Sequence, residues 1–169
     1  RVMASAATAA SMSRGDTSRK FSFRLRSEEL VHAPPVVSVV LPCYNEAAHV
    51  VAELERITAA LDASGLTYEL LAIDDASTDG TLQVVRDNAA RFPHLQVIAF
   101  RRNGGSGTVR RIGTQLARGE IVVWTDADMS YPNEQIPALV RELLEDPSYD
   151  QVVGARTSEE GSHKWLRWP

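Results

Sequence analysis

The chain has 169 residues, of which 44% are hydrophobic and 24% charged, so it can bury one sizeable globular core. No apolar run approaches 18 residues, which excludes a transmembrane helix and the apolar part of a signal peptide within this sequence. The net charge of the chain is −4, but it is unevenly distributed: residues 1–26 carry six basic residues and one acid, and residues 27–169 carry a net charge of −9. This acidic part of the sequence argues against a nucleic-acid-binding face.

Residues 1–34 are predicted to form a basic leader without stable structure, because they are rich in Ala, Ser and Thr and end at a Pro-Pro pair. Within this leader, residues 20–26 alternate apolar and polar side chains, which suits an edge strand or a contact with a membrane surface. The folded domain is predicted over residues 35–156.

Strands and helices alternate from residue 36 onward. Runs of β-branched and apolar residues predict strands over residues 36–41, which Pro42 should close, and over 68–73, 95–100, 121–124 and 149–155. Apolar residues at helical spacing predict helices over residues 46–61, with Asn45 as the N-cap, and over 79–92, 108–117 and 133–144. This alternation with short connections predicts an α/β fold, a mostly parallel sheet with helices on both faces.

Two carboxylates follow the apolar run over residues 121–124. Asp126 and Asp128 are two positions apart, so in an extended chain both side chains point to the same side of the strand end. Ligands of open α/β sheets bind at this end of the strands. Paired carboxylate oxygens suit a hard cation such as Mg²⁺ or Mn²⁺, and such a cation would hold a diphosphate. An Asp-x-Asp pair in an ordinary surface loop is the competing interpretation.

Two further strand ends carry polar and aromatic side chains. After the first strand, Tyr44 offers a ring that can stack on a base, and Glu46 is a polar neighbour. After the second strand, Asp74 or Asp75 can accept a hydrogen bond from a uracil or guanine imide or from a ribose hydroxyl. The competing interpretation of this second loop is a capped turn, in which residues 77–79 bind helix N–H groups.

A glycine-rich loop over residues 104–107 precedes the helix predicted over 108–117. It lacks the third glycine of a dinucleotide fingerprint and the Gly-Lys-Ser/Thr ending of a phosphate loop. We expect a loop that closes over a donor diphosphate, with Arg110 or Arg111 reaching a phosphate. A solvated helix face is the alternative for both arginines.

Three motifs, VSVVLPCYNE, AIDDASTDGT and WTDADMSYP, stand in an order and at a spacing that resemble the family 2 glycosyltransferases, which have the Rossmann-like GT-A fold. The resemblance covers residues 36–156. It implies a nucleotide-sugar donor bound by the first two motifs, with Asp126 and Asp128 at the metal and the diphosphate. The nucleotide contacts that it implies are Pro42, Tyr44, Glu46, Asp74, Asp75, Asp126 and Ala127.

Within that family, the glycine loop, DADMSYP and VVGAR look most similar to the polyprenyl- and dolichyl-phosphate mannose or glucose synthases. This resemblance implies that Arg156 binds phosphate and that the acceptor is a lipid phosphate, which can attack a GDP- or UDP-sugar without a general base and with inversion. Ser130 stands where some relatives have a further metal ligand, so the metal shell would depend on water.

The C-terminal residues 157–169 have no regular pattern and look like the start of an acceptor-side, membrane-proximal segment, so we expect the chain to be truncated there. A hydroxyl acceptor, which needs a carboxylate base, and an inactive nucleotide-sugar-binding fragment remain alternatives. A nucleotidyltransferase would require a different glycine-rich loop after the first strand. Cys43, the only cysteine, suits a cytoplasmic location, either free or at the cytoplasmic face of a membrane.

Overall fold

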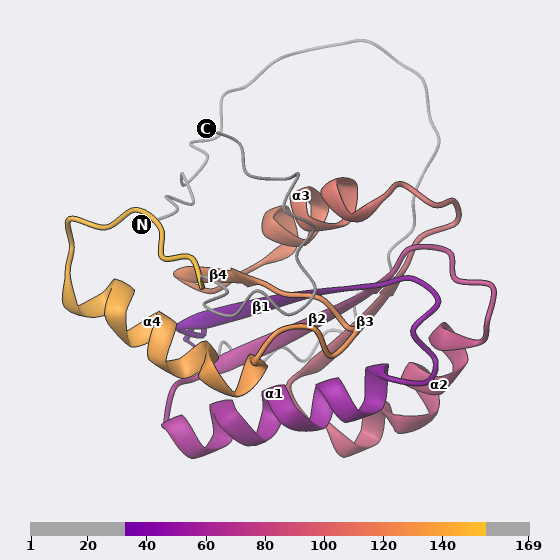
Figure 1. The fold of residues 1–169 in the computed structure, drawn as a ribbon, viewed down its shortest axis with the longest axis horizontal. Helices are drawn as coiled ribbons and strands as arrows, with labels where there is room; N and C mark the ends of the chain where they lie inside the picture. Colours follow the sequence, from indigo (N-terminus) through magenta and orange to yellow (C-terminus); the bar gives the residue numbers. More distant parts are fainter. Residues whose placement is uncertain (1–32, 155–169) are drawn as a thin grey trace, which may run out of the picture.

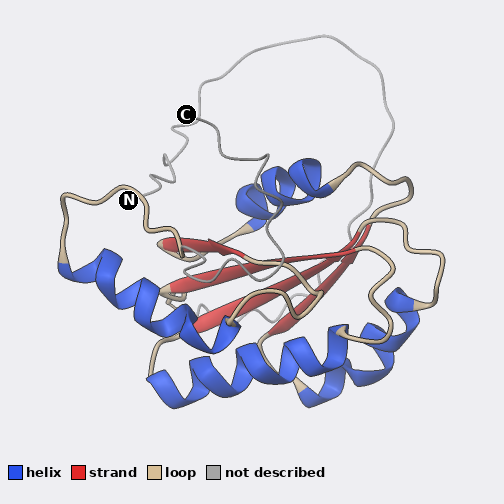
Figure 2. Ribbon diagram, viewed as in Figure 1, coloured by secondary structure: helices blue, strands red, loops and turns tan. Residues whose placement is uncertain are grey.

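The computed structural model describes residues 33–154 as a sheet covered by helices on both faces (Figure 1, Figure 2). Residues 1–32 of the predicted leader, with the edge strand predicted over 20–26, lie outside the described residues, as do Arg156 and residues 157–169. No helix between residues 33 and 154 combines the length and the apolar character that a membrane span requires.

The sheet has four parallel strands in the order β3-β2-β1-β4. The two central strands are almost entirely buried, as expected for strands covered on both faces. The order changes direction between β1 and β4, so a ligand-binding crevice is expected at their carboxyl ends. The strands are β1 (Val37–Cys43), β2 (Tyr68–Asp74), β3 (Leu95–Ala99) and β4 (Ile121–Trp124).

Helices α1, α2 and α4 cover one face of the sheet and α3 covers the other (Figure 1). Two short 3₁₀ turns, η1 and η2, extend α2 and precede α4. The predicted parallel α/β architecture with helices on both faces is therefore confirmed. The helices are α1 (Val50–Ser64), α2 (Thr81–Asn88), η1 (Ala89–Arg91), α3 (Ser106–Leu116), η2 (Asn133–Gln135) and α4 (Ile136–Glu145).

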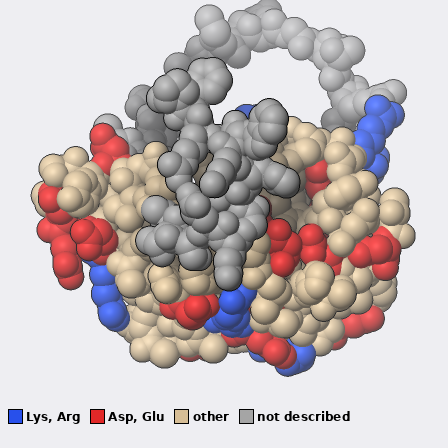
Figure 3. Space-filling model, viewed as in Figure 1, with Lys and Arg blue, Asp and Glu red and all other residues tan. Residues whose placement is uncertain are grey.

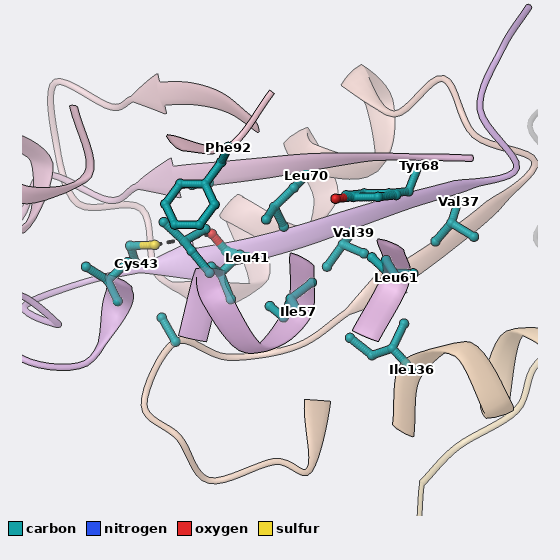
Figure 4. Packing of buried hydrophobic residues seen from close by; sticks show 14 of the residues in the cluster. Val37, Val39, Leu41, Cys43, Ile57, Leu61, Tyr68, Leu70, Phe92 and Ile136 are labelled. Carbon is teal, nitrogen blue, oxygen red and sulfur yellow. Dashed lines mark hydrogen bonds between the residues drawn. The ribbon is translucent and has the colours of Figure 1, made fainter. Parts of the chain in front are cut away.

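Alternate residues of β1 belong to two different cores, as the period of a strand requires. Val39 and Leu41 pack with Ile57 of α1 in the larger core, which Figure 4 shows from close by. Val40 points to the opposite face and packs with Val109 of α3. Both cores are closed by fully buried aliphatic side chains, so the sheet is a rigid platform for the loops at its carboxyl edge.

Helix α3 approaches the sheet closely because Gly113 has no side chain. A Cβ atom at this position would lie 2.4 Å from Cγ1 of Val40, well inside van der Waals contact. Any larger residue would push α3 away from β1. The position of this helix matters for the site, because its amino end lies at the carboxyl edge of the sheet.

The predicted boundaries of the loop between β1 and α1 were wrong. Helix α1 begins at Val50 rather than at residue 46, and Asn45 is not its cap; its φ of 58° places it in the left-handed region, and its Oδ1 accepts a hydrogen bond from Thr78 N. Pro42 does not close β1, which continues to Cys43. Since β1 pairs with β4 only as far as Val40, the missing N–H of Pro42 breaks no bond between these strands.

The fifth strand predicted over residues 149–155 is also wrong for its described part. Residues 149–154 form no strand, and Val153 is 71% exposed. Asp146 instead organises a turn after α4: its carboxylate accepts the N–H of Ser148, and its carbonyl accepts the N–H of Tyr149. The β-branched pair Val152-Val153 suggested a strand, but the described part of this segment pairs with no strand of the sheet.

Candidate active site

A pocket of about 160 Å³ lies at the carboxyl edge of the sheet, where β1 and β4 end. It brings together residues of all three strand-end loops and the first residues of α3. Seven of the residues predicted to bind the nucleotide or the metal line this pocket, although their roles stay predictions. The lining residues are Pro42, Cys43, Tyr44, Glu46, Asp75, Ser106, Val109, Asp126, Ala127 and Asp128.

Asp126 and Asp128 follow β4 directly and both face the pocket. Oδ1 of Asp126 accepts a hydrogen bond from Nη2 of Arg110 at 2.8 Å, and Oδ1 of Asp128 accepts one from Ser130 N at 3.0 Å. Within residues 33–154 no cluster of three or more His, Cys, Asp or Glu side chains could enclose a metal. Two carboxylates beside an open pocket nevertheless fit Mg²⁺ or Mn²⁺, which commonly take their remaining ligands from water and substrate phosphates.

Arg110 is the basic residue that the structure places at the site. It reaches across from α3 to Asp126, while its Nε atom is buried and has no hydrogen-bond partner. A guanidinium held in this way can turn one donor toward a phosphate without leaving α3. Arg111, the other candidate, is exposed to solvent on the same helix.

Asp75 is buried and binds the glycine loop. Its two carboxylate oxygens accept the backbone N–H groups of Gly104 at 2.7 Å and Gly105 at 2.8 Å, while its own N–H donates to the carbonyl of Cys43. These bonds connect the end of β1 to the start of α3. Each oxygen retains a free lone pair, so Asp75 can still accept a hydrogen bond from a ligand in the pocket.

Asp74 is equally buried but lies outside the pocket lining. Its Oδ2 accepts the N–H of Ser77 at 3.2 Å, whereas its Oδ1 has no partner. Burial, together with the charges of Asp74 and Glu46, raises the pKa of the Cys43 thiol to about 12. Cys43 therefore stays a neutral wall of the pocket and is not a nucleophile.

The turn over residues 77–81 holds the loop after β1 in place. Ser77 Oγ accepts the N–H of Asn45, Thr81 Oγ1 accepts the N–H of Glu46, and Asp79 Oδ2 accepts the N–H of Ala47. The competing interpretation, in which residues 77–79 bind helix N–H groups, holds only for Asp79, which accepts the N–H of Thr81. Hydrogen bonds, led by the Thr81 hydroxyl, hold the pKa of Asp79 below its ordinary value.

Backbone strain is concentrated in the same three loops. The non-glycine residues with positive φ in the described chain are Asn45 at 58°, Ala76 at 59° and Met129 at 63°. One of them follows each of the strands β1, β2 and β4. Left-handed backbone is costly for such residues and clusters at binding and catalytic sites.

Three residues of the pocket were missed by the sequence analysis: Cys43, Ser106 and Val109. Ser106 belongs to the glycine loop that the sequence had already indicated. Val109 has only the apolar spacing of a core residue, and indeed it is fully buried on α3. Such pocket walls give no signal of their own in a sequence, because they serve the core and the site together.

The parallel sheet, the pocket at its switch point and the paired carboxylates define an α/β protein with a candidate ligand-binding site at the carboxyl edge of its sheet. A family model described as glycosyl transferase family 2 matches residues 38–169, so the chain belongs to glycosyltransferase family 2. The predicted family is thereby confirmed.

The similar proteins include an undecaprenyl-phosphate 4-deoxy-4-formamido-L-arabinose transferase of Aeromonas hydrophila, 39% identical over 133 residues. This match covers 78% of the chain and 40% of that relative, so the chain spans well under half of the relative's length. This relative is a sugar transferase that acts on a polyprenyl phosphate by its name, so the subgroup that the sequence resembles is represented among the similar proteins.

Two similar solved structures allow the fold to be compared. A mannosyltransferase from Pyrobaculum calidifontis, in complex with GDP-Man and Mn²⁺, has a TM-score of 0.58 and 32% identity, with 68% of this chain and 33% of that chain covered. A glucosyl-3-phosphoglycerate synthase from Mycobacterium tuberculosis, in complex with Mn²⁺, UDP and glucosyl-3-phosphoglycerate, has a TM-score of 0.53 and 28% identity, with 65% of this chain and 40% of that chain covered. The GT-A fold is confirmed.

Proposed function

We propose that this chain is the donor-binding part of an inverting, metal-dependent glycosyltransferase that transfers a hexose from a nucleotide-sugar to a polyprenyl phosphate. The observation that carries the proposal is the pocket at the carboxyl ends of β1 and β4. One side of it offers an exposed ring and a buried acceptor, and the other offers two carboxylates. This arrangement matches the base and the diphosphate of one nucleotide-sugar.

Tyr44 and Asp75 would hold the base. Tyr44 is 48% exposed on the pocket rim, so its ring is available for stacking. The carboxylate of Asp75 accepts two backbone N–H groups and can also accept the imide N–H of uracil or guanine. Pro42 and Ala127 would form the walls, while Glu46 would bind a sugar hydroxyl or the ribose.

Asp126 and Asp128 would hold Mg²⁺ or Mn²⁺ beside the diphosphate. When bound, this cation would stabilise the negative charge of the departing nucleoside diphosphate. Arg110 already faces Asp126 and would share the developing charge by turning toward a phosphate oxygen. The amino end of α3, whose Ser106 lines the pocket, adds a positive dipole on the same side.

The acceptor would be a lipid phosphate, as the names of the curated relatives suggest. Such a phosphate is ionised at neutral pH, so one of its oxygens can attack the anomeric carbon without a general base. A new C–O bond then forms on one side of the sugar while the C–O bond to the diphosphate breaks on the other, which inverts the configuration. Arg156 would bind the acceptor phosphate, and the reaction would take place at the cytoplasmic face of a membrane.

A second function is compatible with the length of the chain. The chain covers 40% of the length of the Aeromonas relative. The second candidate function is binding of the donor without transfer of the sugar. A hydroxyl acceptor would additionally need a carboxylate base, and the carboxylates that line this pocket, Glu46, Asp75, Asp126 and Asp128, are all assigned here to the donor or the metal.

The proposal is tested by calorimetric titration of the chain with GDP and with UDP, each with and without Mn²⁺. We expect one nucleotide to bind and Mn²⁺ to strengthen its binding at least tenfold, which would also identify the donor base. Equal binding with and without Mn²⁺ would refute the metal assignment. Binding of neither nucleotide by a folded chain would refute the donor site in this chain.

A further inference from the structure

A buried carboxylate on α1, Glu53, lies behind the pocket and does not line it. It is 0% exposed. Its Oε1 accepts Nδ2 of Asn133 at 2.7 Å and Nε of Arg56 at 3.1 Å, and its Oε2 accepts Nη2 of Arg56 at 2.7 Å. A charge buried this deeply is normally kept only with a full set of partners, which Glu53 has.

The first branch of this network leads to the residue before Asp126. Asn133 is buried in η2, and its Oδ1 accepts the hydroxyl of Thr125 at 2.5 Å. Thr125 is buried too, and its N–H continues the β4 side of the sheet by donating to the carbonyl of Val40 at 3.3 Å. The start of the DAD loop, residues 126–128, is therefore tied to α1 through Asn133.

The second branch leads to the residue after Asp128. Nη2 of Arg56 lies 3.5 Å from Sδ of Met129, and its Nη1 donates to Oε2 of Glu134 at 3.4 Å. Met129 has a φ of 63°, so the chain turns sharply there. Glu53 and Arg56 of α1 thus reach both ends of the DAD loop across a sequence separation of more than 70 residues.

We propose that Glu53 is a positioning residue and that Glu53, Arg56, Thr125 and Asn133 form a loop clamp that holds the DAD loop in its binding geometry before any ligand arrives. Two neighbouring carboxylates repel each other, so an unsupported loop would separate them in the absence of a cation. A clamp at both ends keeps them facing the pocket and lowers the ordering cost of binding. Its effect on donor binding rests on the proposed function, whereas its effect on the loop does not.

Thr125→Val tests the clamp with little change of shape, because it replaces the hydroxyl that binds Asn133 by a methyl group. The first measurement is amide hydrogen exchange of residues 126–131 in the ligand-free chain. We expect exchange there to become about tenfold faster, since the loop would open locally more often. Thr125→Ser keeps the hydroxyl and should restore slow exchange.

Ser38→Ala is the matched control. Ser38 is also fully buried, and its hydroxyl donates to a side-chain oxygen, Oε1 of Glu69, at 2.6 Å, but at the opposite edge of the sheet. This variant should lower the stability of the fold without accelerating exchange over residues 126–131. Equal exchange of these amides in Thr125→Val and Ser38→Ala would overturn the clamp.

The second measurement is the affinity for the nucleotide, GDP or UDP, that binds the parent chain with Mn²⁺. We expect it to fall about tenfold in Thr125→Val and to stay within about twofold in Thr125→Ser and Ser38→Ala. Glu53→Gln, which removes the charge facing Arg56, should resemble Thr125→Val in both measurements. A parent chain that binds no nucleotide would refute the donor site, while the exchange result would still decide the clamp.

Discussion

The amino edge and the carboxyl edge of the sheet both bury acidic side chains, but the two edges differ in how completely these side chains are hydrogen-bonded. At the amino edge, Glu69 is surrounded by donors: the Ser38 hydroxyl at 2.6 Å, the N–H of Arg118 at 2.7 Å, Nε of Arg118 at 2.9 Å and Nε2 of Gln96 at 3.0 Å. Burial raises the pKa of Glu69, but these hydrogen bonds outweigh it and hold the pKa below its ordinary value. Through these hydrogen bonds the Glu69 carboxylate links β1, β2, β3 and the turn before β4.

At the carboxyl edge the polar groups are incompletely satisfied. Oδ1 of Asp74 and Nε of Arg110 are buried without partners, and Tyr44 is half exposed on the pocket rim. The described non-glycine residues with positive φ also lie at this edge, whereas the turn between α1 and β2 uses Gly65 for the same purpose. Satisfied polar groups therefore mark the edge that stabilises the fold, and unsatisfied or strained ones mark the edge adapted to a ligand.

The exposed acidic side chains are not confined to one edge of the sheet. Figure 3 shows acidic groups toward both sides of the viewed face, with basic groups among them. This distribution agrees with the acidic net charge of the sequence beyond residue 26. The contrast between the two edges rests on hydrogen bonding.

Removing the amino-edge carboxylate should have the largest effect, and on stability alone. Glu69→Ala leaves the Ser38 hydroxyl and the N–H of Arg118 without their acceptor, so we expect the free energy of unfolding to fall by about 3 kcal/mol. Denaturant unfolding measures this loss. Glu120→Ala, an exposed acid at the same edge, should change it by less than about 0.5 kcal/mol.

The same variant has a pH signature. Because the folded pKa of Glu69 lies below its ordinary value, its contribution is complete above about pH 4.3, the unfolded pKa of a glutamate, and is lost as the pH falls through the folded pKa. The parent should therefore lose stability more steeply than Glu69→Ala below this pH. Parallel acid profiles of the two proteins would mean that the hydrogen bonds do not favour the charged form.

Removing a carboxylate at the carboxyl edge should weaken ligand binding and leave stability nearly unchanged. Asp128→Ala takes away one of the two pocket carboxylates, so we expect Mn²⁺-dependent nucleotide binding to weaken about 100-fold. The free energy of unfolding should stay within about 0.5 kcal/mol of the parent, because Asp128 is exposed. Calorimetry and denaturant unfolding measure the two effects, with the exposed Asp87→Ala of α2 as the control. Unchanged binding would remove Asp128 from the site.

The basic residues of α3 allow a finer comparison. Arg110→Gln removes the guanidinium that faces Asp126, and we expect nucleotide binding with Mn²⁺ to weaken about tenfold, because a charged hydrogen bond to a phosphate is lost. Arg111→Gln alters the exposed neighbour and should stay within about twofold of the parent. If both variants bound equally well, Arg110 would belong to the solvated helix face instead.

The periodicity of the sequence located the four parallel strands, since alternating strands and helices with short connections admit few arrangements, but it also predicted a fifth strand that the described residues do not form. It also located the carboxylates, because Asp126 and Asp128 follow an apolar run directly. Local patterns failed where distant contacts decide the structure. Asn45 looked like a helix cap, but Thr78 and Ser77, more than 30 residues away, hold it in a left-handed turn.

The loop clamp shows the same limit more clearly. Glu53 and Asn133 are 80 residues apart, and no spacing rule connects them. Asp75 likewise occupies a predicted nucleotide-binding position, yet its bonds to Gly104 and Gly105 come from a loop about 30 residues away. The sequence therefore predicts which residues reach the pocket edge, whereas their support depends on tertiary contacts.

The smallest predicted effect tests whether the carboxyl edge is strained. Ala76→Gly should relieve the left-handed φ of 59° and raise the free energy of unfolding by about 0.5 kcal/mol, since the relief exceeds the extra freedom of glycine in the unfolded chain. Ala89→Gly, at a φ of −58°, should instead lower it by about 0.5 kcal/mol. Opposite signs for one substitution at these two positions would show that the strain belongs to the ligand-binding edge. Equal destabilisation would mean that Ala76 sits in its turn without strain, and that only the unpaired polar groups distinguish this edge.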